Sequence, residues 1–145
     1  MRPYFSSFYS HQQVAVLVEL VKGEEAAAIV ETVNRVNKII AEMPTTGQTE
    51  DPERAKTIEL LGGDPDDHVV YLHYFIAGCD WWIIEKDVED GVSQAFGYAC
   101  MNDPEMSELG YISITEITDL GAEMDLYWEP KLLSVVKKEL FGRGS

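Results

Sequence analysis

Positively charged residues are almost missing from the second half of this chain. Residues 61–130 contain sixteen Asp and Glu residues and a single basic residue, Lys86. Residues 1–60 carry nine acidic and six basic residues, and residues 131–145 carry one acidic and four basic residues. The three segments therefore contribute −15, −3 and +3 to the net charge of −15. An acidic coat that serves solubility alone would cover the whole surface, so this segregation indicates a local cause such as a partner.

The chain also lacks the features of membrane and exported proteins. It has no run of about 18 or more apolar residues. The first residues, MRPYFSSFYSHQQ, lack the charged-then-apolar layout of a signal peptide. Cysteine is scarce too, because Cys79 and Cys100 alone provide neither metal-ligand spacing nor a disulfide framework. We therefore expect a cytoplasmic protein with two reduced thiols, no membrane contact, no metal and no cofactor.

What the chain does contain is enough apolar sequence for one core. A length of 145 residues with 46% hydrophobic content is typical of a single domain. We expect that domain to span residues 1–145, with a helical N-terminal segment over 1–62 and an acidic, sheet-containing part over 63–140.

Helical signals dominate the first segment. Ser10 followed by Gln13 is a capping-box pattern, which predicts a helix over 11–22 that ends before a glycine. Apolar residues at Ile29, Val33 and Val36 then recur at helical spacing, so a second helix with one buried stripe should end by residue 43, ahead of a proline. A short third helix should begin at residue 52 and stop at the glycines 62–63.

Beyond residue 63 the pattern changes to that of strands. β-branched and aromatic runs predict strands over 69–76, 80–87, 94–101, 110–114 and 124–128. Ser113 and Glu116 form a second capping box for a short helix, and KLLSVVKKEL predicts a final helix. The expected fold class is α+β: N-terminal helices packed on a mainly antiparallel meander sheet of about four to five strands, with a C-terminal helix.

A family resemblance rests on short motifs in the strand-rich half. The segments HYF, DWWIIEKD, AFGYA, ELGYISITEI, DLYWEP and LLSVV occur in that order between residues 69 and 136. This order resembles an uncharacterised domain-of-unknown-function family carried by conjugative plasmids, integrated elements and phages. Trp82 stands where that family usually has tyrosine. The residues that follow its pattern are Glu85, Phe96, Gly97, Tyr98, Gly110, Tyr111, Ser113, Glu116, Asp125, Leu126 and Tyr127. The resemblance implies a mobile-element context, and residues 1–62 lie outside it.

Charge decides which partners the sheet can take. Aromatic rings on a sheet can stack on bases, but that mode needs a basic groove for the nucleic-acid backbone, and Lys86 alone cannot supply one. We therefore expect no direct nucleic-acid binding.

The leading hypothesis is an acidic, non-enzymatic protein that binds the basic surface of a nucleic-acid-handling complex. It would act as a nucleic-acid mimic against host defence, of the anti-CRISPR or anti-restriction type. The average charge density, about one per 500 Å² of surface, is lower than the roughly one per 100 Å² of B-DNA. Mimicry thus requires the acidic loops to gather. The expected partner-binding residues are Asp64, Asp66, Asp67, Glu85, Asp87, Glu89, Asp90, Asp103, Glu105 and Glu108.

Two other interpretations stay open. His73, with Glu85 on the neighbouring predicted strand and Asp87, has the residue types of a small metal-dependent or acid–base hydrolase. No EF-hand or His-x-x-x-His spacing accompanies the acids, so we expect no catalytic residues and no metal ligands under the leading hypothesis. The third interpretation is a homodimer formed through exposed sheet aromatics.

Overall fold

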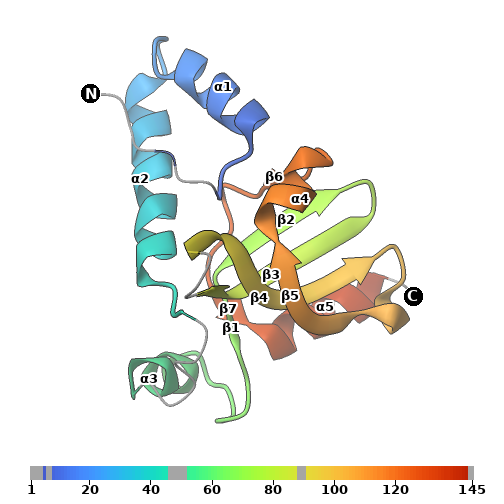
Figure 1. Ribbon diagram of the computed structural model, residues 1–145. Helices are drawn as coiled ribbons and strands as arrows, with labels where there is room; N and C mark the ends of the chain where they lie inside the picture. The colour runs from blue at the N-terminus through green and yellow to red at the C-terminus, as the bar shows by residue number, and fades with distance from the viewer. Residues whose placement is uncertain (1–4, 6–7, 46–51, 88–90, 144–145) are drawn as a thin grey trace.

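The computed structural model describes residues 5, 8–45, 52–87 and 91–143 (Figure 1). Three helices lead the described chain: α1 (His11–Leu20), α2 (Ala26–Glu42) and α3 (Pro52–Leu60). The strands that follow are β1 (Val69–Val70), β2 (Leu72–Ile76), β3 (Cys79–Asp87), β4 (Gly91–Met101), β5 (Glu108–Ser113), β6 (Glu123–Met124) and β7 (Lys131–Leu132). A 3₁₀ turn, η1 (Pro104–Met106), precedes β5, and α4 (Ile114–Asp119) and α5 (Leu133–Arg143) complete the elements.

The main sheet is an antiparallel meander extended by a late strand. Its five strands lie in the order β5-β4-β3-β2-β6, and β1 pairs separately with β7. Each pairing is antiparallel. The predicted α+β class, with helices, a meander and a C-terminal helix, is confirmed.

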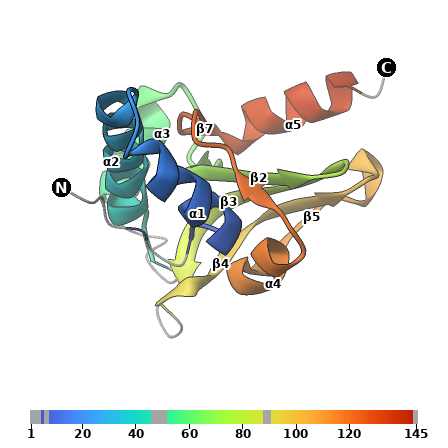
Figure 2. The same cartoon turned by 90° about the horizontal axis from the view of Figure 1, so that it is seen from above.

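Helices cover both faces of this sheet. Figure 2 shows α5 on one side and α1 and α4 on the other. On the α1/α4 side, one buried cluster joins Leu17 and Val33 of the N-terminal helices to Tyr74, Trp81 and other sheet residues. On the α5 side, a second cluster packs Val136 and Leu140 against Trp82 and Tyr98. Strand alternation produces this division, because Trp81 and Trp82 point to opposite faces.

Local signals set the helix ends as expected. The Gln13 N–H donates to Ser10 Oγ (3.0 Å), and the Glu116 N–H donates to Ser113 Oγ (3.2 Å), so both predicted caps are formed. Carbonyl groups at the C-terminal end of α2 accept hydrogen bonds from a side chain of the sheet. Lys86 Nζ donates to Ile40 O (2.8 Å) and Ala41 O (3.5 Å). An ammonium at a helix C-terminus also interacts favourably with the helix dipole.

The predicted strand over 124–128 is wrong beyond Met124. The Tyr127 N–H donates to Asp125 Oδ1 (3.0 Å) and the Trp128 N–H to Asp125 O (3.3 Å). Aspartate favours such turns because its short side chain accepts a hydrogen bond from the backbone two residues on. Residues 125–130 therefore form a loop between β6 and β7, called the 125–130 loop below. Two smaller differences are the separation of β1 from β2 and the strand β7 ahead of α5.

Among the described residues, no helix is long and apolar enough to cross a membrane.

Candidate functional site

A cleft of about 370 Å³ lies on the α5 side of the sheet. His73 of β2 and Trp82 of β3 form its floor, since they are directly paired in the sheet. The remaining lining comes from the 125–130 loop and α5, and consists of Asp125, Trp128, Val136 and Glu139. Segments from three parts of the chain thus meet at one hollow that contains both aromatic and charged groups.

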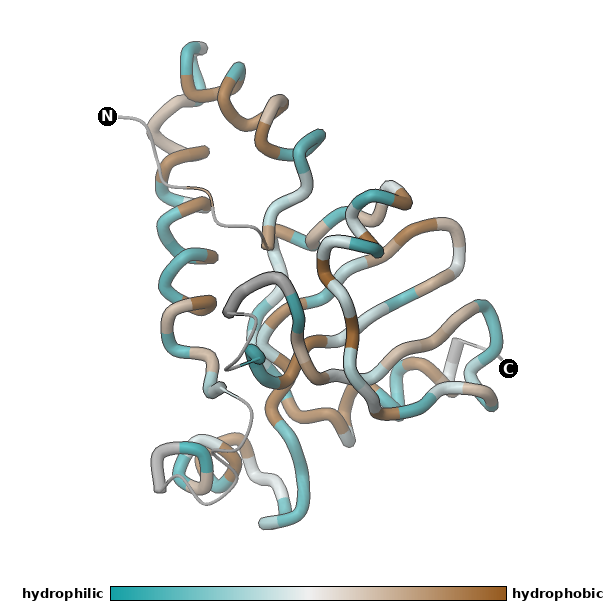
Figure 3. The backbone as a smooth tube through the Cα atoms, viewed as in Figure 1, coloured by the Kyte–Doolittle hydropathy of each residue, from teal (hydrophilic) through white to brown (hydrophobic). Residues whose placement is uncertain are grey.

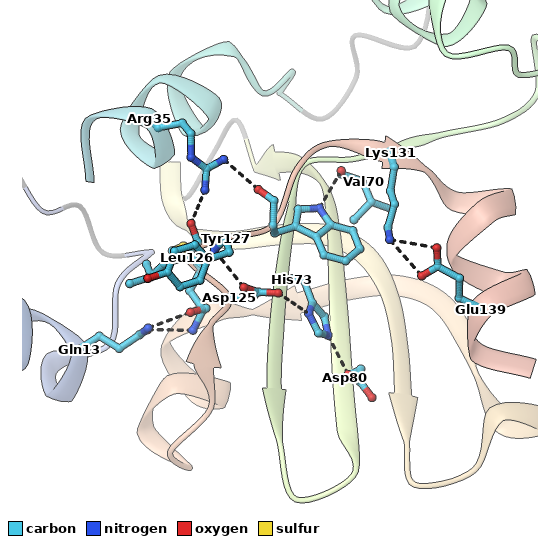
Figure 4. Close-up of polar contacts among 12 residues, drawn as sticks. Gln13, Arg35, Val70, His73, Asp80, Asp125, Leu126, Tyr127, Lys131 and Glu139 are labelled. Carbon is cyan, nitrogen blue, oxygen red and sulfur yellow. Dashed lines mark hydrogen bonds and ion pairs between the residues drawn. The ribbon is translucent and has the colours of Figure 1, made fainter. Parts of the chain in front are cut away.

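His73 lies between two carboxylates (Figure 4). Its Nε2 is 2.7 Å from Asp80 Oδ1, and its Nδ1 is 3.8 Å from Asp125 Oδ2. Nδ1 is buried and makes no hydrogen bond. One ring nitrogen is therefore held by Asp80, and the other is closed off from solvent beside Asp125.

Aromatic rings surround the imidazole. Trp82 stacks on it with an interplanar angle of 12° and a centroid separation of 5.4 Å, and the centroids of Trp128 and Phe75 lie 5.1 and 5.7 Å away. The Trp128 indole is itself fixed, because its Nε1–H donates to Val70 O (3.2 Å). The cleft walls are thus held rigidly by contacts to the sheet.

An ammonium group already lies against one wall. Lys131 Nζ is 4.5 Å from the centroid of the Trp128 ring and donates to both Glu139 carboxylate oxygens, at 3.1 and 3.0 Å. The pair of Lys131 and Glu139 is visible beside the cleft in Figure 4. A cation over an indole face with a carboxylate alongside is a favourable arrangement.

The N-terminal helices hold the 125–130 loop in place. Gln13 of α1 makes two hydrogen bonds of 2.8 Å with the Met124 backbone, one as donor and one as acceptor. Arg35 of α2 donates to Trp128 O (3.1 Å) and also to Leu126 O (Figure 4). The helices α1 and α2 therefore position Asp125 and Trp128, although neither helix lines the cleft.

The residues predicted to bind a partner do not form one group. Asp103, Glu105 and Glu108 lie where β4 passes into β5, at the end of the sheet marked by the Cys79–Met101 pair. Glu85 and Asp87 lie at the other end of β3, which is about 27 Å away at the usual rise of a strand.

The acidic loops are also apart from one another. The loop with Asp64 and Asp66, ahead of β1, and the β4–β5 loop are drawn teal on different sides of the molecule in Figure 3. Glu89 and Asp90 lie outside the described residues.

Among those predicted residues, Asp67 is half-buried and Glu85 is buried. Asp67 accepts hydrogen bonds from Ser134 Oγ (2.6 Å) and from the N–H groups of His68 (2.8 Å) and Ser134 (3.3 Å), which satisfies the first turn of α5. Although burial acts to raise the pKa of Asp67, these bonds outweigh it and lower that pKa. Glu85 is 6% exposed, and burial raises its pKa despite the opposing effect of the Arg54 guanidinium. Glu85 is therefore withdrawn from the surface, whereas Asp67 is half-buried and bonded to the start of α5.

The proposed pairing of His73 with Glu85 is wrong. His73 opposes Trp82, whereas Glu85 lies three residues further along β3, past a β-bulge, and opposes Phe96. The carboxylates at His73 are Asp80 and Asp125, which the sequence analysis did not select. Asp80 could have been found from a two-residue turn at Ala77-Gly78, where both φ angles are positive, because that turn fixes the register of the hairpin. Asp125 has no such local signal.

Within the described ranges, no group of three or more His, Cys, Asp and Glu residues is arranged to hold a metal ion. No family model, curated protein or solved structure matches the chain. The resemblance to a mobile-element family therefore stays a prediction.

Proposed function

We propose that this protein is a non-enzymatic binding protein that presents uncompensated carboxylates to a basic surface of a nucleic-acid-handling complex, in the context of a mobile genetic element. The observation that carries the proposal is the exposure of these acids. Nine of the fourteen described carboxylates between residues 61 and 130 are exposed: Asp64, Asp66, Asp103, Glu105, Glu108, Glu116, Asp119, Glu123 and Glu129.

The one base of this segment does not offset them. The Lys86 ammonium is committed to the carbonyl groups at the end of α2. The ion pairs made by Lys22 and Lys131 join glutamates at 19 and 139, which lie outside residues 61–130. Within the described part of the chain, no ion pair therefore joins a base to the nine exposed carboxylates. Unpaired carboxylates attract a basic surface from a distance and speed the encounter.

Mimicry of nucleic acid is the finer form of this proposal. Fifteen net charges over a surface of 8638 Å² correspond to about one charge per 580 Å², nearly six times more dilute than on B-DNA. A mimic would therefore work through local groups of acids, and Asp103, Glu105 and Glu108 are the group that the β4–β5 connection brings together.

The contacts of the two His73 ring nitrogens favour a binding role over an acid–base one. A general base needs a nitrogen within hydrogen-bond reach of the substrate proton. Although the half-buried ring lines the cleft, Nε2 is held by Asp80 and the Nδ1 atom is buried.

The test is capture of a basic complex from host lysate at low and high salt. A variant with Asp103→Asn, Glu105→Gln and Glu108→Gln should lose the captured complex, and salt should release it from the unmodified protein. The matched control removes three exposed charges from the other half, with Glu24→Gln, Glu31→Gln and Glu42→Gln, and should retain it. Equal capture by both variants, or capture that survives high salt, would contradict the proposal.

Two further measurements refine the outcome. Competition of the captured complex by duplex DNA tests mimicry, because a mimic and its model cannot occupy the same surface together. Sedimentation of the purified protein tests the separate hypothesis of a homodimer.

A further inference from the structure

We propose that the cleft between β2, β3, the 125–130 loop and α5 is a binding site for one organic cation, an alkylammonium group. The inference rests on the proposed function only for the source of that group, which is either a lysine side chain of the partner or a free amine. The site itself is argued from the cleft residues.

The sign of the charge in the cleft selects the ligand. The charged side chains that line the cleft beside His73 are two carboxylates, Asp125 and Glu139. Around them, Asp80 adds a third negative charge, and Lys131, paired with Glu139, and Arg35, bonded to Trp128 O, add two positive charges. The sum is −1 with a neutral His73 and zero with a protonated one, so the lining carboxylates and the net charge of the whole chain provide the attraction for a cation.

The walls of the cleft select the shape of the ligand. The half-buried Trp128 lines one wall, and an indole face is the aromatic surface that attracts cations most strongly. Trp82 lines the floor, where one of its faces stacks on His73. Asp125 and Glu139 line the same space and supply acceptors for ammonium N–H groups. Val136 adds an apolar contact suited to an alkyl stem. A volume of about 370 Å³ is at the lower end for small-molecule sites, and is sufficient for an ammonium on a short chain.

Lys131 serves as an internal example of the ligand. Its ammonium already uses Trp128 and Glu139, at 4.5 Å from the ring centroid and 3.0 Å from the nearer oxygen. The side chains of Lys131 and Glu139 are 33% and 57% exposed, so the pair is accessible from solvent. An arriving ammonium would take over these contacts, which makes Lys131 a competitor for the site.

The experiment is a titration of the full chain with 1-butylammonium, followed through the indole N–H resonances of its three tryptophans. Those of Trp82 and Trp128 should shift. Trp81 belongs to the buried cluster on the opposite face of the sheet, so its resonance should stay in place and report an intact fold. The neutral analogue 1-butanol should move none of them.

Three variants examine the assignment. Trp128→Leu should weaken binding about tenfold or more, in line with the loss of a desolvated cation–π contact. Glu139→Gln, a change at an accessible side chain, should weaken binding about threefold with the Trp81 resonance unchanged. Lys131→Gln removes the competing ammonium and should strengthen binding.

The outcomes separate this inference from the proposed function. Indole resonances of Trp82 and Trp128 that stay in place, that move equally with 1-butanol, or that respond identically in Glu139→Gln would overturn the cation site, whatever the capture experiment shows.

A peptide with one lysine between glycines identifies the source of the ammonium group. Tighter binding of the peptide than of 1-butylammonium supports a partner lysine, and equal or weaker binding supports a free amine. Loss of salt-sensitive capture in the Asp103, Glu105 and Glu108 variant concerns the proposed function alone.

Discussion

Glu85 shows how one acidic residue can look suited to partner binding in the sequence and still be buried in the structure. It follows a β-bulge, where β3 shifts register between Ile83 and Glu85 against β4. The carboxylate is 6% exposed, and burial, opposed by the Arg54 guanidinium, raises its pKa. A buried carboxylate with a raised pKa is a cost to the folded state whenever it is ionised.

This cost makes a prediction about pH. Because the folded state binds the Glu85 proton more tightly than the unfolded state, its contribution to stability is fully present below the unfolded pKa. It is lost as the pH rises through the folded pKa. Glu85→Gln removes that loss. The stability of the variant relative to the unmodified protein should therefore increase as the pH rises from about 4 to about 7.

Urea unfolding at those two pH values measures the effect. The exposed residue Glu108 is the matched control, because Glu108→Gln changes the same functional group in the same sheet. A stability difference between Glu85→Gln and the unmodified protein that is the same at both pH values would contradict the prediction.

At the scale of elements, the connection between α2 and the 125–130 loop is the contact on which the cleft depends. Arg35 donates to the backbone at Trp128 and Leu126 from one guanidinium. Arg35→Gln removes these charged donors, and hydrogen bonds to charged groups contribute about 1.5–3 kcal/mol each. We expect the free energy of unfolding to fall by at least the contribution of one such bond, about 1.5–3 kcal/mol. The Trp128 indole resonance should also shift.

Lys38 provides the control on the same helix. It is exposed, so Lys38→Gln removes one positive charge from α2 without touching the loop. Similar losses of stability in the two variants, or an unmoved Trp128 resonance in Arg35→Gln, would show that α2 does not position the loop.

The glycines of the two Gly-Tyr pairs differ in what they allow. Gly97 and Gly110 are paired across β4 and β5. A Cβ added at Gly97 would lie 2.2 Å from Trp82 O, whereas nothing lies within 4 Å of a Cβ at Gly110. The close approach of β3 and β4 therefore requires glycine at 97 alone.

Alanine substitutions separate these two roles. Gly97→Ala must push β3 and β4 apart and should cost about 3 kcal/mol or more. Gly110→Ala should change stability by no more than about 0.5 kcal/mol. Urea unfolding of the two variants measures both values, and equal costs would refute the close-contact explanation.

Across the whole molecule, what sequence could predict follows the range of the interactions. Helix caps at Ser10 and Ser113 depend on neighbours three residues away, and both were predicted correctly. The cleft depends on contacts between distant segments. Asp125 is placed beside His73 by a turn within MDLYW, a sequence typical of a strand. The contacts of Gln13 with Met124 and of Arg35 with Trp128 join residues 111 and 93 positions apart.

The N-terminal segment is the largest consequence of such long-range contacts. Residues 1–62 lie outside the family resemblance. In the structure Val33, Val36 and Ile40 of α2 share one buried cluster with Tyr74 and Trp81 of the sheet. Without α1 and α2, α4 alone would cover this face, and the part of it that packs on α2 would be open to water.

Removal of the first sixty residues should therefore prevent folding of the rest. A fragment of residues 61–145 would expose the Tyr74 and Trp81 face, and each large side chain removed from water contributes about 1.5–3 kcal/mol. Domains are stable by only about 5–15 kcal/mol, so the loss of several such contacts exceeds the margin. We expect the fragment to show no cooperative urea transition and no near-ultraviolet circular dichroism from its tryptophans. A cooperative transition in the fragment would instead mean that α1 and α2 are dispensable for the sheet, and that their role is confined to holding the 125–130 loop.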